Sequence, residues 1–306
     1  MSAQPERQEY VVVNEQRSLS VDVAGAEHGW PVFLMHGTPG SRSGPRPRSS
    51  VLYRLGIRLI SYDRPGYGGS MRHPGRRVSD AALDVAAIAD HLGIKTFSVI
   101  GRSGGGPHAL ACAALLPDRV LRAAVLVGLA PSDAVGLDWF GGMTESNQRA
   151  FGTAEHDAMI LAEQLRLRAE RANDDPGSLL KFLIQQMTEA DRRVVSGVPI
   201  RRLLTDSYAE ALRGGPDGWI DDVLALRADW GFTLTEIHMP VRLWHGADDN
   251  FAPASHSRWL AAQIPGAQVE VQRHTAHFGA VEVLPEILAW LTPPGDFPPI
   301  RLDEDR

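Results

Sequence analysis

A single serine stands among glycines at the point where a strand-like segment meets a helix-like one. The stretch SVIGRSGGGPHAL, residues 98–110, fits the pattern G-x-S-x-G with Ser103 at its centre. In a strand–turn–helix, a sharp turn brings Gly101 and Gly105 together and projects the serine hydroxyl clear of the sheet. The amide groups that begin the helix then face any negative charge that develops there. Ser103 is therefore a candidate nucleophile, although the pattern alone also occurs in turns without chemistry.

A phosphate-binding loop is the other chemical interpretation of these glycines. Such a loop needs the spacing G-x-G-x-x-G on the first strand of a βαβ unit. Here the glycines follow a late strand and lack that spacing. Whether Ser103 is a nucleophile or part of an ordinary turn therefore depends on whether the sequence also supplies a base and a carboxylate.

The base for a nucleophilic serine is expected to be a histidine on a loop at the carboxyl ends of the strands. The stretch RHTAHFGAVEVL, residues 273–284, offers His274 and His277 between the last strand-like and the last helix-like segment. We favour His277, because His274 lies closer to the strand. Two histidines three residues apart could also hold a metal, but no third ligand cluster accompanies them, so we expect no metal.

The carboxylate that orients this base should follow an earlier strand. The stretch RLWHGADDNFAP, residues 242–253, offers Asp248 and Asp249, and LVGLAPSD, residues 126–133, offers Asp133. Position along the chain decides only weakly among the three. The order Ser103, Asp249, His277 is the order in which the triad of an α/β-hydrolase occurs.

Two inward backbone N–H groups would have to stabilise the oxyanion that forms after attack. Gly104, directly after the serine, supplies one of them. The loop MHGTPGSRSG, residues 35–44, follows the third predicted strand, and Thr38 in this loop is the expected second donor. Losing one such donor typically costs about 3 kcal/mol of transition-state stabilisation.

The elements that must position these residues alternate between strands and helices. Near-continuous apolar runs of strand length indicate a parallel sheet covered by helices on both faces, preceded by one antiparallel pair. A stretch that is nearly all helical interrupts this pattern and is expected to roof the site, because ligands bind beyond the carboxyl ends of such strands. The predicted organisation is a first core part over residues 1–131, a helical cap over 132–236, a second core part over 237–292 and an irregular tail over 293–306.

Composition excludes several classes of protein. The 306 residues are 43% hydrophobic and 22% charged, which is typical of a soluble globular enzyme. A net charge of −6 argues against nucleic-acid binding, and no run reaches the roughly 18 apolar residues of a membrane span. The polar N-terminus has no secretory signal, and a lone cysteine, Cys112, cannot form an internal disulfide. We expect a cytoplasmic protein that acts on a small molecule, with neither a nucleic-acid nor a membrane partner; the sequence does not indicate the oligomeric state.

Five motifs together resemble the α/β-hydrolase superfamily, in its branch with a helical cap after the sixth strand. The motifs are HGTPGS (36–41), YDRPGYGGS (62–70), GRSGGG (101–106), WHGADDNFAP (244–253) and AHFG (276–279). The resemblance implies an eight-stranded, mostly parallel sheet and a Ser–Asp–His triad. It selects Asp249, which matches a D-x-x-x-P pattern, and leaves Asp133 in reserve. It gives Asp63 and Arg64 a structural role.

The resemblance also implies an activity. We expect a serine hydrolase without a cofactor, most simply a carboxylic ester hydrolase, that cleaves an ester, lactone, thioester or amide of a small to medium apolar substrate through an acyl-enzyme. One alternative is a cofactor-free reaction other than hydrolysis on the same triad, such as acyl transfer, perhydrolysis, cyclisation or elimination. The third possibility is a binding protein of this fold without enzymatic activity.

Two further expectations concern the surroundings of the triad. Trp139, Phe140 and Met143 come where the chain enters the cap, and we predict that they line the substrate pocket. Arg102 replaces the His or Gln that often precedes the nucleophile in relatives. We favour a structural role in which Arg102 pairs with a carboxylate, over contact with an acidic substrate.

Overall fold

The computed structural model describes residues 7–14 and 17–293, and these form one eight-stranded sheet. Its spatial order is β1-β2-β4-β3-β5-β6-β7-β8. Strand β2 runs antiparallel to its two neighbours, and the remaining pairs are parallel. The strands are β1 (Arg7–Asn14), β2 (Arg17–Gly25), β3 (Trp30–Met35), β4 (Ile57–Tyr62), β5 (Phe97–Arg102), β6 (Val120–Leu126), β7 (Val241–Gly246) and β8 (Gln268–Gln272). The mostly parallel eight-stranded sheet predicted above is confirmed.

Helices cover both faces of the sheet, so its central strands are apolar on both sides. In β3, Phe33 and Met35 pack on one side, whereas Val32 and Leu34 pack on the other. This alternation follows from the two-residue period of a strand. The first face is covered by α2 (Asp80–His91), α3 (Gly105–Leu115) and α10 (Ser255–Gln263), and the second by α1 (Ser49–Arg54) and α11 (Ala280–Leu291).

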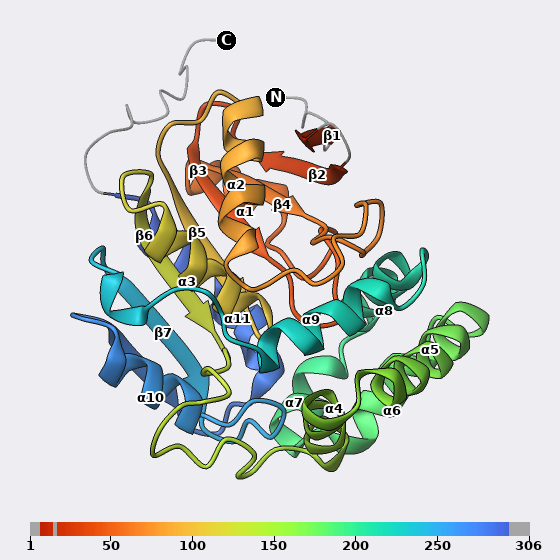
Figure 1. Cartoon of the computed structure of the whole chain (residues 1–306). Helices are drawn as coiled ribbons and strands as arrows, with labels where there is room; N and C mark the ends of the chain where they lie inside the picture. The colour runs from red at the N-terminus through yellow and green to blue at the C-terminus, as the bar shows by residue number, and fades with distance from the viewer. Residues whose placement is uncertain (1–6, 15–16, 294–306) are drawn as a thin grey trace.

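A helical segment connects β6 to β7 and lies beyond the carboxyl ends of the central strands (Figure 1). It contains α4 (Glu145–His156), α5 (Ala158–Asp174), α6 (Ser178–Gln186), α7 (Glu189–Val195), α8 (Val198–Leu212), α9 (Asp217–Arg227) and the short 3₁₀ helix η1 (Leu234–Glu236). On α5 the side chains at 4, 4, 3 spacing, Leu161, Leu165, Ala169 and Ala172, are all buried. We call residues 132–236 the cap segment.

The sequence pattern overestimates the length of the sixth strand. The apolar run 120–130 continues past Leu126, but β6 ends there because Val127 has a φ of +48°, which a strand cannot accommodate. The chain leaves the sheet at this residue and enters the cap segment. Residues 294–306, most of the predicted irregular tail, lie outside the described part of the chain. Among the described helices, none is both long and apolar enough to cross a bilayer.

Candidate active site

Ser103 occupies the sharp turn between β5 and α3. Its φ is +54°, and its N–H donates to the carbonyl of Leu126 on the neighbouring strand at 2.8 Å. Only glycine fits at the positions two residues before and two residues after Ser103. A Cβ at Gly101 would come within 2.1 Å of the Gly105 carbonyl oxygen, and one at Gly105 within 2.4 Å of the Met35 carbonyl oxygen. The close approach of β5, α3 and the end of β3 is therefore what forces the serine into a conformation that L residues rarely adopt.

Asp249 and His277 come from loops that follow β7 and β8. The Nδ1 of His277 lies 2.8 Å from Oδ2 of Asp249, and both side chains are almost completely buried. An ionised carboxylate can only accept, so Nδ1 carries the proton and Nε2 is the basic nitrogen. Burial by itself would raise the pKa of Asp249, but His277 and the hydrogen bonds from imidazoles outweigh burial and hold that pKa below its usual range. The sequence predicted both residues but not the second imidazole.

That second imidazole belongs to His245, the fifth residue of β7. Its Nε2 lies 3.1 Å from the same Oδ2 of Asp249 and also contacts the carbonyl of Ala252, so this nitrogen must donate. Its Nδ1 then accepts from Ser257 Oγ at 2.7 Å. The other carboxylate oxygen of Asp249 accepts the N–H groups of Phe251 (2.8 Å) and Ala252 (3.0 Å). Asp249 thus has little freedom to move away from His277.

Thr38 and Gly104 flank Ser103 at the ends of two neighbouring strands. Met35 at the end of β3 is in register with Gly101 on β5, which brings the loop after β3 beside the serine turn. Among the described residues, the backbone N–H groups of Thr38 and Gly104 have no hydrogen-bond acceptor. Both residues line the pocket that contains Ser103. These N–H groups are free to receive an oxyanion.

A buried cluster of charges holds the loop that carries Thr38. Asp222 on α9 accepts hydrogen bonds from Thr38 Oγ1 at 2.6 Å and Tyr67 Oη at 2.9 Å, and it pairs with Arg64 and Arg76. Arg64 also donates to the carbonyls of residues 36 and 37. Burial acts to raise the pKa of Asp222, but the two guanidinium groups keep it well below its usual value. The cap segment therefore helps to fix the loop after β3, as expected of a structural role for Arg64.

The pocket beside Ser103 has a volume of about 90 Å³ and lies between the sheet and the cap segment. His277 and Arg168 are its only ionisable lining groups besides the phenol of Tyr208, within the part of the chain that the structure describes. The hydroxyl of Tyr208 makes no hydrogen bond to a described residue, and burial raises its pKa to about 12. The apolar lining residues are Pro39, Leu129, Ala150, Phe151, Leu179, Phe182, Leu183, Trp219, Val223, Leu226, Phe251, Ala252 and Phe278.

The aromatic residues predicted for substrate contact do not line this pocket. Trp139 packs edge-on against Phe140, Phe151 and His256, and its indole N–H donates to the carbonyl of Ala130. Like Trp139, Met143 is buried and absent from the pocket lining. The chain turns at Gly142, with a φ of +85°, so these residues form a packed layer behind α4. The part of the lining that the cap segment contributes comes mainly from α4, α6 and α9, with Arg168 from α5 and Tyr208 from α8.

The alternative triad residues lie elsewhere. His274 is exposed, with a φ of +58°, and Asp133 and Asp248 are both exposed loop carboxylates. None of the three lines the pocket. The described residues contain no group of three or more His, Cys, Asp and Glu side chains that could hold a metal ion. The sole cysteine, Cys112, is buried in α3, and burial raises its pKa well above the usual value.

A further carboxylate from the cap segment reaches the turn that carries His277. Asp191 on α7 is fully buried, and its Oδ1 accepts the N–H of Phe278 at 2.7 Å, whereas its Oδ2 has no partner among the described residues. Burial raises the pKa of Asp191 to about 6, against the lowering effect of His277 and the N–H of Phe278. No local motif around Asp191 signals this contact, because only the packing of α7 creates it.

Comparison with known proteins places the chain in a family. The family model for the alpha/beta hydrolase fold matches residues 31–282. The chain is 27% identical over 262 residues to a 2-hydroxymuconate semialdehyde hydrolase of Pseudomonas putida (83% of each chain). It is 29% identical over 230 residues to a pimeloyl-[acyl-carrier protein] methyl ester esterase of Nitrosomonas europaea (72% of this chain, 78% of the relative).

Solved structures show the same fold. A bromoperoxidase from Bacillus anthracis superposes with a TM-score of 0.69 at 20% identity, over 93% of this chain and 98% of that one. The curated relatives are named as hydrolases. Because the family model spans most of its length, the chain belongs to the alpha/beta hydrolase fold family.

Proposed function

We propose that this protein is a serine hydrolase that cleaves a carboxylic ester, lactone, thioester or amide through an acyl-enzyme, with a carboxylic ester as the first candidate. One observation carries the proposal. His277, whose Nδ1 lies 2.8 Å from Asp249 Oδ2, lines the same pocket as Ser103, which has a left-handed backbone conformation. With the proton on Nδ1, His277 Nε2 is the nitrogen that can act as the base.

In the proposed reaction, Ser103 Oγ forms a bond to the substrate carbonyl carbon while His277 Nε2 takes the hydroxyl proton. The carbonyl oxygen becomes an oxyanion and receives the N–H groups of Thr38 and Gly104. The bond to the leaving group then breaks, and His277 gives this group its proton. Water then attacks the acyl carbon while His277 takes its proton. The bond between that carbon and Ser103 Oγ breaks, His277 returns the proton to Oγ, and the acid is released. Asp249 keeps the tautomer of His277 and stabilises the imidazolium.

The apolar lining of the pocket supports a substrate whose acyl or alkoxy part is largely apolar. The α-helices that line the pocket all belong to the cap segment, which would shield the acyl-enzyme from bulk water. Ser103 Oγ makes no hydrogen bond to a described residue. The hydrogen bond between a catalytic serine and its base is commonly long in free enzymes and tightens when substrate binds.

Active-site labelling tests the proposal. The purified protein and its Ser103→Ala variant are treated with a fluorophosphonate, and the adduct is located by peptide mass spectrometry. We expect one adduct, on Ser103, and none on the variant. Turnover of a panel of esters, lactones and amides should fall by roughly a millionfold in the variant, with unchanged thermal unfolding.

Other outcomes point to other functions. Labelling of Ser103 without hydrolysis of any panel member would favour a cofactor-free reaction other than hydrolysis on this triad. A protein that is neither labelled nor active would contradict an activated serine and favour a binding protein. A variant that keeps more than about one-tenth of the turnover would also refute the nucleophile, since removal of a triad serine costs far more.

A further inference from the structure

Arg102 is the residue before Ser103, and its guanidinium has no carboxylate partner among the described residues. The expected structural ion pair is therefore not found. Its Nη1 is sealed from solvent without a hydrogen-bond partner, and Nη2 lies against Gly37, where an added Cβ would be 3.8 Å away. Burial lowers the pKa of Arg102, and only the nearby phenol of Tyr208 acts in the opposite direction.

The arginines that are buried in the described chain behave differently from Arg102, which is partly exposed apart from its sealed Nη1. Arg17 pairs with Asp84, Arg64 and Arg76 pair with Asp222, and Arg42 pairs with three carboxylates, those of Asp22, Asp63 and Glu210. This is the usual condition of a buried guanidinium, because an isolated charge in a protein interior is costly. Arg102 has no such carboxylate among the described residues, although its Nη1 is sealed from solvent.

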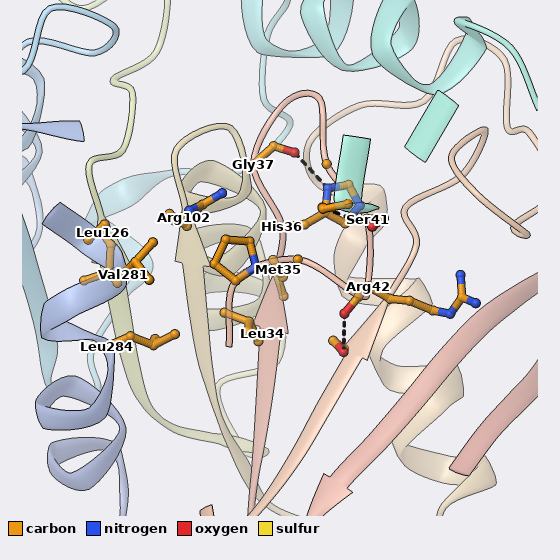
Figure 2. A pocket seen from close by; sticks show the side chains of 16 residues that line it. Leu34, Met35, His36, Gly37, Ser41, Arg42, Arg102, Leu126, Val281 and Leu284 are labelled. Carbon is orange, nitrogen blue, oxygen red and sulfur yellow. Dashed lines mark hydrogen bonds between the residues drawn. The ribbon is translucent and has the colours of Figure 1, made fainter. Parts of the chain in front are cut away.

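A cavity lies beside Arg102 and is lined by other residues of the loop after β3 than the pocket of Ser103. Figure 2 shows Arg102 between an apolar wall formed by Leu126, Val281 and Leu284 and a polar wall formed by His36, Ser41 and Arg42. The cavity volume is about 20 Å³. Since one water molecule needs a cavity of roughly 10–15 Å³, this cavity has room for one ligand slightly larger than water.

The remaining polar groups leave the cavity with one positive charge. His36 is neutral, because burial holds its pKa well below the usual value; its Nδ1 donates to Gly37 and its Nε2 accepts from a backbone N–H. Arg42 is neutralised by its carboxylates. Ser41 and Ser207, whose hydroxyls are 3.1 Å apart, are neutral donors, and no carboxylate lines the cavity among the described residues.

We infer that this cavity is a binding site for a small monovalent anion of the size of chloride, held by the Arg102 guanidinium. The anion provides the counter-charge that no described carboxylate supplies, and the volume of about 20 Å³ favours a small ion. The site is separate from the proposed acyl-transfer site, since Arg102 does not line the pocket of Ser103 and that pocket shares no described residue with this cavity.

Thermal unfolding in chloride tests the inference. The wild-type protein is moved into sodium gluconate, and sodium chloride then replaces gluconate at constant ionic strength. We expect Tm to rise and saturate, because a ligand of the native state at ten times its Kd lowers the unfolded-to-folded ratio about 11-fold. The Arg102→Gln variant should show no rise. The Arg258→Gln variant, which removes an exposed positive charge on α10, should respond like the wild type.

Equal responses of all three proteins, or no response of the wild type, would overturn the site. A second measurement does not depend on the variant's folding. Crystals of the wild type grown without chloride are soaked in bromide, and an anomalous peak in contact with the Arg102 guanidinium is expected. A cavity that holds only water in those crystals would equally contradict the inference.

Discussion

The carboxylate of Asp191 and the backbone N–H of Phe278 lie 2.7 Å apart, so helix α7 of the cap segment holds the turn that carries His277. Asp191 is buried and its pKa is raised to about 6. The native state therefore binds the carboxyl proton of Asp191 more tightly than the unfolded chain does, because an aspartate in an unfolded chain has a pKa of about 3.9. The contribution of the protonated Asp191 carboxyl to the free energy of unfolding is greatest below pH 4 and is lost as pH rises to about 6.

An Asp191→Asn variant should lose this pH dependence. The amide oxygen can still accept the N–H of Phe278, and the buried charge is gone. We expect the wild type to lose at most about 3 kcal/mol relative to the variant between pH 4 and pH 7. Urea unfolding at several pH values measures the difference. Asp118→Asn, at an exposed aspartate, serves as the control, and parallel curves for wild type and Asp191→Asn would refute the assignment.

Replacing Asp249 with asparagine should abolish most of the turnover without unfolding the protein. The amide would present a donor or a weaker acceptor to His277 Nδ1 and would favour the wrong tautomer, a change that costs about 10⁴-fold in kcat for such triads. The neighbouring Asp248→Asn variant is a matched control, because Asp248 is exposed. Steady-state kinetics on the best ester of the panel compares the two. Similar losses in both variants would contradict the role of Asp249.

His245 should act as a positioning residue for Asp249. His245→Gln keeps a donor that can reach the carboxylate, whereas His245→Leu leaves Asp249 without this hydrogen bond. We expect the leucine variant to lose about 1–3 kcal/mol of stability through the unsatisfied carboxylate and to lower kcat with little change in KM. The glutamine variant should recover part of both losses. Rescue of stability alone, with kcat unaffected in either variant, would indicate a purely structural contact.

The cluster around Asp222 offers a test with two adjacent aspartates. Asp222→Asn leaves Arg64 and Arg76 buried without their carboxylate, and breaking a buried pair in this way costs about 3–5 kcal/mol. Asp221→Asn, one residue earlier, loses a pair with Arg72, which is 39% exposed, so its cost should stay below about 1 kcal/mol. Chemical denaturation of both variants gives the comparison. Equal costs would show that the cluster does not stabilise the fold as proposed.

The sheet and the triad candidates could be predicted because each depends on a local pattern. Apolar runs of strand length mark the strands, and Ser103, Asp249 and His277 each follow one of them. The carboxyl ends of parallel strands meet at one edge, so residues far apart in sequence are brought together by topology alone. His245 carries a weaker signal of the same kind, since it lies at the end of β7, four residues before Asp249.

The lining of the pocket could not be predicted in this way. Trp139 follows the sixth strand directly, yet the turn at Gly142 directs that segment into packing behind α4. Tyr208 and Asp191 reach the site from α8 and α7, whose placement depends on how the helices of the cap segment pack against one another. No periodicity within a single helix specifies that packing, so these two residues carried no sequence signal.

The Asp222 cluster has a consequence for how a substrate enters. It ties α9 to the loop after β3, so α9 is anchored to the floor of the pocket. On the opposite side, Ser146, Arg168 and Phe182 line both the pocket of Ser103 and an open hollow on the protein surface. The cap segment is therefore fixed to the core on the side of α9 and faces the surface hollow on the side of α4, α5 and α6. Passage of substrate and product is expected between α4, α5 and α6, which carry these three shared side chains.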